Sequence, residues 1–134
     1  MVIFPSEEYV TKLSELLNSS KEFEEAATGW EGDFLFTITP DENLNEEVRM
    51  YADLWNGKCR EARIIPKDEE KETVFALKGP YSKWKAMLKK ETDPIRAILY
   101  EEIEFKGDMS KVTSYLPALK LMIDILTSVE TEFL

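Results

Sequence analysis

The sequence contains no histidine, one cysteine and five scattered glycines among its 134 residues. Without histidine there is no Ser–His or Cys–His nucleophilic pair, and the commonest general base and metal ligand is missing. The single cysteine, Cys59, leaves no internal disulfide and no structural zinc set. The glycines form no cluster, so no phosphate-binding loop is present. We therefore expect no enzyme, no catalytic residues, no metal and no cofactor.

Long apolar runs are missing too. No stretch approaches the roughly 20 apolar residues that span a bilayer, and the first residues lack the basic start and apolar run of a signal peptide. We therefore expect a cytoplasmic protein. Hydrophobic residues make up 43% and charged residues 33% of the chain, which is ordinary for a globular protein. No repeat or linker interrupts the chain, so we expect a single domain over 1–134.

Basic residues are few in the first third of the chain. The net charge is −10, and residues 1–47 hold 12 acids against only Lys12 and Lys21, so the whole excess lies there. An acidic surface repels phosphate backbones, which argues against a nucleic-acid partner. The simplest interpretation is a solvated acidic face that keeps the protein in solution.

The first third of the chain predicts two helices followed by a strand. Ser6 is suited to cap a first helix, whose apolar residues follow helical spacing from Tyr9 to Leu17. A shorter helix is expected to end at Gly29. From Trp30 to Ile38 apolar residues alternate with polar ones, which is typical of a half-buried strand.

Three more strands are expected in the middle, over 48–54, 59–65 and 73–78. Asn56-Gly57 is a strong signal for a two-residue hairpin between the first two of them. Pro66 to Glu70 is expected to be a polar turn. Links this short favour a mostly antiparallel arrangement, because parallel neighbours need a long crossover.

The last third predicts helices with one more strand between them. A helix carries Tyr81, Trp84 and Met87 on one face, and Asp93-Pro94 opens another. Leu99–Lys106 is expected to be a fifth strand, and a helix apolar on several sides is expected over 114–129. This order predicts an α+β fold with a five-stranded, mainly antiparallel sheet and helices packed on one face.

Three groups of polar or reactive side chains could serve a function, but each also has an ordinary structural explanation. Glu101, Glu102 and Glu104 could serve as an acid pair, yet a solvated strand face explains them more simply. Cys59 is expected to be an apolar filler rather than a redox thiol. Four lysines around Trp84 leave transient contact with an anionic membrane open as an alternative to an ordinary surface helix; they are Lys83, Lys85, Lys89 and Lys90.

The stretch from Tyr81 to Asp108 carries a resemblance to a known family. It contains Trp84 and Leu88, the Asp93-Pro94 helix start with Ala97, alternating apolar residues over 99–105, and the Gly107-Asp108 step. In this order of elements the chain resembles the sterol carrier protein family, in its lipid-binding domain of type two. The strands from Trp30 to Lys78 are similar to the antiparallel meander of that family.

The resemblance implies an apolar tunnel between sheet and helices, lined or closed by the C-terminal helix. It further implies a ligand such as a fatty acyl chain, a sterol or an isoprenoid-like lipid, and no catalysis. We expect eleven apolar side chains to be the candidate lining: Phe36, Leu54, Trp84, Met87, Leu88, Ile103, Phe105, Leu119, Met122, Ile123 and Leu126. The alternatives are an interaction or homodimerisation module of the same fold with a filled core, and an enzyme that uses carboxylates or tyrosines.

Overall fold

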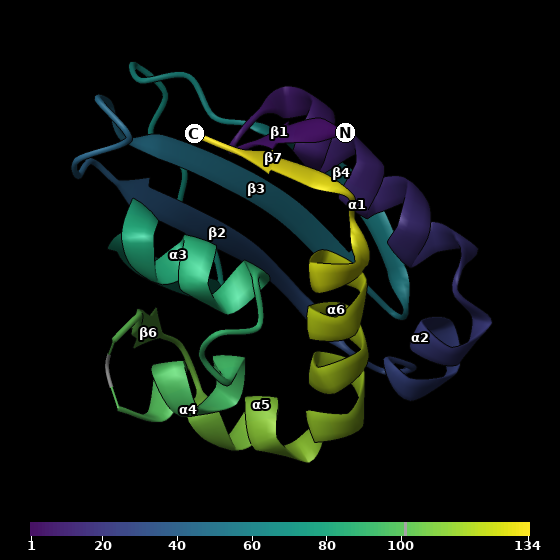
Figure 1. The fold of residues 1–134 in the computed structure, drawn as a ribbon. Helices are drawn as coiled ribbons and strands as arrows, with labels where there is room; N and C mark the ends of the chain where they lie inside the picture. The colour runs from purple at the N-terminus through teal and green to yellow at the C-terminus, as the bar shows by residue number, and fades with distance from the viewer. Residues whose placement is uncertain (101) are drawn as a thin grey trace.

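The protein is a two-layer α+β structure in which helices cover one face of a five-stranded sheet (Figure 1). The computed structural model describes residues 1–100 and 102–134, without the side chains of residues 98 and 99. In chain order the elements are β1 (Val2–Phe4), α1 (Glu7–Ser19), α2 (Lys21–Ala26), β2 (Glu31–Thr39), β3 (Val48–Trp55), β4 (Lys58–Ile64), β5 (Phe75–Pro80), α3 (Tyr81–Leu88), α4 (Pro94–Leu99), β6 (Glu104–Lys106), α5 (Met109–Ser114), α6 (Leu116–Ser128) and β7 (Thr131–Phe133).

The large sheet has the strand order β4-β3-β2-β5-β6. Its pairs are antiparallel except for β2 and β5, which are parallel. The predicted fold class is confirmed, with one parallel pair that the short links did not suggest. The parallel pair arises because residues 65–74 form a crossover rather than a simple turn, and β5 starts two residues later than predicted.

The crossover lies on the face of the sheet opposite the helices. The Arg49 guanidinium donates hydrogen bonds to the carbonyl oxygens of Pro66, at 2.6 Å, and Glu69, at 2.7 Å. At its other end, the Val74 amide donates to a carboxylate oxygen of Asp33 at 2.8 Å. Polar side chains of β2 and β3 thus hold this segment and direct the chain to the free edge of β2.

The predicted alternation along β2 and β3 is confirmed. Phe34, Phe36 and Ile38 are buried on the helix-facing side. Phe34 lies opposite Ala52 and Phe36 opposite Met50, so the apolar residues of both strands share that side. Side chains that alternate along neighbouring strands in register present one apolar face, and this face is the base of the core.

The predicted helix starts are confirmed by their capping hydrogen bonds. The Ser6 hydroxyl accepts from the Tyr9 amide at 3.1 Å, and Asp93 accepts from the Ile95 amide at 3.0 Å. Asp108 likewise accepts from the Ser110 amide at 3.0 Å and begins α5. Each cap satisfies an amide that has no partner within its own helix.

Two predicted elements have different bounds. The strand expected over 99–106 is only β6, because the helix that begins at Asp93-Pro94 continues to Leu99; Glu101 lies outside the described residues. The helix expected over 114–129 is α6, preceded by the separate helix α5. The break is at Tyr115, whose backbone has φ −116° and ψ 30°, and Pro117 follows in the first turn of α6.

The two ends of the chain lie side by side, which the sequence did not suggest (Figure 1). β1 and β7 form a separate parallel pair. The buried Tyr9 donates its hydroxyl hydrogen to the carbonyl of Leu126 at 3.0 Å, and the hydroxyl of the buried Tyr81 accepts from the Leu134 amide at 2.7 Å. Both tyrosines therefore hold the last helix and strand against the rest of the core.

The hairpin glycine provides a test of how α2 packs on the β3–β4 turn. Gly57 has φ +85°, and a Cβ there would lie 2.6 Å from the carbonyl oxygen of Glu24 in α2. We expect Gly57→Ala to lower the free energy of unfolding by about 2–3 kcal/mol, through backbone strain and this clash. Urea unfolding followed by circular dichroism measures it.

Lys58→Ala in the same turn is the matched control. Its ammonium pairs with Glu24 at 2.6 Å, but both side chains are about half exposed, so the loss is expected to stay below about 1 kcal/mol. Equal stability of the Gly57→Ala variant and the unaltered protein would show that the turn is not constrained by α2.

Candidate functional site

Two apolar cavities lie between the sheet and the helices. The first has a volume of about 30 Å³ and the second a volume of about 190 Å³. The first is lined by Phe23, Ala27, Trp30, Phe34, Leu54, Val112, Tyr115, Ala118, Leu119 and Met122. The second is lined by Phe34, Leu77, Ile95, Phe105, Met109, Val112, Thr113, Leu116 and Leu119.

The two cavities adjoin, because Phe34, Val112 and Leu119 line both. Phe34 belongs to the sheet, whereas Val112 and Leu119 come from α5 and α6. Val112 is buried and Leu119 is half-buried. Among the described residues these three side chains are the ones common to both walls, so they form the boundary between the two spaces.

A cluster of stacked aromatic rings forms the sheet side of the first cavity. The Trp30 and Phe34 rings are stacked with centroids 5.8 Å apart, and Phe75 stacks on both, at 5.0 Å and 5.2 Å. Gly32 makes this possible, since a Cβ there would lie 2.7 Å from the Phe75 ring. Large flat rings held in this way form a rigid wall at low conformational cost.

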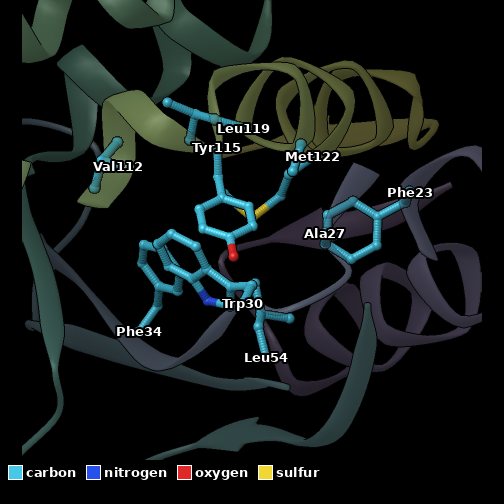
Figure 2. Close-up of a pocket in the computed structure, with 10 residues that line it drawn as sticks. Phe23, Ala27, Trp30, Phe34, Leu54, Val112, Tyr115, Leu119 and Met122 are labelled. Carbon is cyan, nitrogen blue, oxygen red and sulfur yellow. The ribbon is translucent and has the colours of Figure 1, made fainter. Parts of the chain in front are cut away.

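The helix side of the first cavity is built around Tyr115. Its ring meets the Trp30 ring edge-on, with centroids 5.3 Å apart at 84°. Figure 2 shows this ring extending from the helices toward Trp30, with Met122 beside it. Because Tyr115 ends α5 just before α6 begins, the break between these helices is what places the ring inside the cavity.

The apolar character of α6 on several sides has a direct structural explanation. Leu119 and Met122 line the cavities, while Leu126 is buried without lining them. Leu121 and Ile125 pack against the core from a third side. One helix therefore serves as cavity wall and as core element, which requires apolar residues around most of its circumference.

The structure brings four of the eleven predicted lining residues to the cavity walls, namely Leu54, Phe105, Leu119 and Met122. Of the other seven, six are buried elsewhere in the core and Ile123 is half-buried on α6; the six are Phe36, Trp84, Met87, Leu88, Ile103 and Leu126. Whether any of the eleven contacts a ligand stays a prediction.

Several wall residues were missed by the sequence reasoning. Trp30 and Phe34 follow the same alternation of apolar and polar residues as Phe36, so this alternation could have identified them as inward-facing. Val112 and Tyr115 carried no such signal, because they belong to a short helix that periodicity did not reveal. A residue that ends one helix before another can be assigned to a cavity only once the angle between those helices is known.

Polar groups that suggested other chemistry lie away from the cavities. Trp84 is buried, and its indole N–H donates to the carbonyls of Thr37 and Gly79 at 3.2 Å and 3.1 Å, so α3 does not present it to a membrane. Within residues 1–100 and 102–134, no three His, Cys, Asp or Glu side chains are grouped to hold a metal ion. Glu102 and Glu104 are exposed.

The helices of the described part of the chain are all too short or too polar to cross a membrane.

Comparison with known proteins relates the chain to one family. The family model described as SCP-2 sterol transfer family matches residues 11–120. A crystal structure of sterol carrier protein 2 superposes with a TM-score of 0.83 at 25% identity, over 92% of this chain and 97% of that one.

Two further solved structures are similar. A conserved hypothetical protein of Thermus thermophilus, described as possibly a sterol carrier protein, gives a TM-score of 0.83 at 25% identity, over 95% of this chain and 90% of that one. Sterol carrier protein 2 of Yarrowia lipolytica gives 0.59 at 11% identity, over 89% of each chain, which shows the fold alone. Comparison with curated proteins gives no significant sequence match.

Cys59, the one cysteine of the sequence, provides a test of its own buried and unreactive placement. The side chain is 5% exposed, and burial raises the pKa of its thiol. A raised pKa leaves less thiolate at neutral pH, so we expect reaction with an aromatic disulfide reagent at least about tenfold slower in the native protein than in urea. The Cys59→Ala variant, which has no thiol, is the control for any signal that does not come from Cys59. Equal rates in both conditions would contradict the buried, inert placement.

Proposed function

This chain belongs to the SCP-2 sterol transfer family, and from that premise we propose that it binds and carries an apolar ligand in the two adjoining cavities. The ligand would be a fatty acyl chain, a sterol or an isoprenoid-like lipid, and no chemical step is involved. The observation that carries the proposal is the lining of the space between sheet and helices, whose side chains are aliphatic, aromatic or methionine apart from Thr113.

The driving force would be the transfer of apolar surface from water into this space. Each buried methylene group contributes about 0.8 kcal/mol, so a chain of ten methylenes gains several kcal/mol even after the cost of immobilisation. An apolar cavity of 190 Å³ has no polar partners to hold water in place, and such cavities accept apolar guests. Affinity would then depend on chain length more than on the end group.

The outer wall of the second cavity includes two short helices. Its lining includes Ile95 from α4, a helix of six residues, and Met109 at the start of α5. Met109 is 37% exposed, and Thr113 one turn later is also exposed. Short helices are held by few contacts and open at low cost. We propose that a ligand enters between α4 and α5.

The alternative function is an interaction or homodimerisation module with a filled core. This alternative assumes a filled core, and the second cavity weakens that assumption because it leaves unfilled space beneath α5 and α6. Homodimer formation and transient membrane contact stay predictions. Sedimentation of the purified protein with and without lipid vesicles addresses both.

Leu119 gives the sharpest test, because it lines both cavities. We expect Leu119→Trp to fill the shared space and weaken binding of a fluorescent fatty acid at least about tenfold. The free energy of unfolding should change by less than about 1 kcal/mol, since the ring enters space that is already open. Fluorescence titration and urea unfolding of the same preparations measure the two effects.

Ile123→Trp is the matched control on the same helix. Ile123 is half-buried but lines neither cavity, so binding should stay within about twofold of the unaltered protein. Loss of binding in both variants would place the ligand elsewhere on α6. Absence of binding by the unaltered protein, together with a lipid-free mass in native mass spectrometry, would refute the carrier function.

A further inference from the structure

The hydroxyl group of Tyr115 differs from those of the other tyrosines. The chain has five tyrosines. Three of their hydroxyls form hydrogen bonds within the protein. Tyr9 donates to the carbonyl of Leu126, Tyr51 donates to the carboxylate of Asp33 at 2.9 Å, and Tyr81 accepts from the amide of Leu134. Tyr100 is 69% exposed and is hydrated by solvent. Tyr115 is half-buried at a cavity wall, and its hydroxyl makes no hydrogen bond to residues 1–100 and 102–134. Because no buried side-chain oxygen of these residues lacks a partner, this hydroxyl oxygen is reached by solvent at the cavity wall.

The other polar groups of the cavity walls are already engaged. The Thr113 hydroxyl donates to the carbonyl of Ser110 at 3.0 Å. The Trp30 indole N–H donates to the carbonyl of Gly32 at 3.0 Å. Tyr115 is therefore the one lining side chain of the described walls whose hydrogen-bonding oxygen is left for a guest.

The hydroxyl lies at the rim of the first cavity rather than at its base. A Cβ placed on Gly29 would be 2.8 Å from this oxygen, so the hydroxyl is close to the backbone of the exposed turn Thr28-Gly29. The Gly29 amide donates to the side chain of Asn56 at 2.8 Å, which ties this turn to the β3–β4 hairpin. The edge-on contact with Trp30 further orients the ring (Figure 2).

We infer that Tyr115 binds the polar end of the ligand, and that the ligand is therefore a lipid with one oxygen-bearing end group, a hydroxyl or a carboxyl. This inference rests on the proposed carrier function. The end group lies at the rim beside Gly29, and the apolar body passes Leu119 into the second cavity. The phenolic O–H can donate to either end group and can accept from an alcohol.

The test compares three ligands of matched chain length: decanol, decanoate and chlorodecane, whose chlorine accepts no strong hydrogen bond. Each displaces the neutral probe N-phenylnaphthylamine from the unaltered protein and from Tyr115→Phe. We expect the variant to bind decanol, decanoate or both about tenfold more weakly, with chlorodecane unchanged within about twofold. Which of the two oxygen ligands loses affinity identifies the end group.

Stability and a second tyrosine provide the controls. The melting temperature of Tyr115→Phe should stay within about 2 °C of the unaltered protein, because no hydrogen bond to a described residue is lost. Tyr100→Phe, on the surface, should leave all three affinities unchanged. Equal affinities of Tyr115→Phe and the unaltered protein for all ligands, or an equal loss for all three, would overturn the inference alone. No binding of any ligand by the unaltered protein would overturn the carrier function with it.

Discussion

Phe34 is the side chain at which the sheet, the helices and both cavities meet. It lies on the central strand β2, pairs in register with Ala52 and Phe75, and stacks on Trp30, Phe36 and Phe75. Stacked rings at centroid distances of 5–6 Å resist compression, so the helices above cannot close onto the sheet at this point. The space on the helix side of these rings is what the rest of the molecule encloses.

The helices enclose that space without filling it. α5 and α6 meet at Tyr115, and the break between them sends Val112 and Leu119 to both cavities and Tyr115 to one. The far end of α6 is held firmly, because Tyr9 binds the carbonyl of Leu126 and β7 pairs with β1. The end of α6 is thereby fixed to the core, whereas its start borders both cavities.

Membership of the SCP-2 sterol transfer family agrees with a binding function. The groups that suggested other chemistry lie outside the cavity walls: Cys59 is buried with a raised pKa, and Glu102 and Glu104 face solvent. A carrier needs no more than this, because the work of binding is done by removing apolar surface from water. What distinguishes one ligand from another would then be the rim, where the Tyr115 hydroxyl makes no hydrogen bond to the described residues.

The sequence by itself determined the α+β class, the inward alternation of β2 and β3, the hairpin at Asn56-Gly57 and the helix starts at Ser6 and Asp93, because each depends on residues a few positions apart. It also placed Leu54, Phe105, Leu119 and Met122 among candidates that the structure brings to the cavity walls. Only the tertiary structure decided four other features. These are the parallel pairing of β2 with β5, the parallel pairing of β1 with β7, the break between α5 and α6, and the position of Tyr115 in the cavity wall. These features join segments far apart in the chain, and local periodicity carries no information on which distant surfaces will meet. Whether an apolar residue fills the core or borders a cavity depends on how closely the opposite layer approaches it, and that distance exists only in the folded protein.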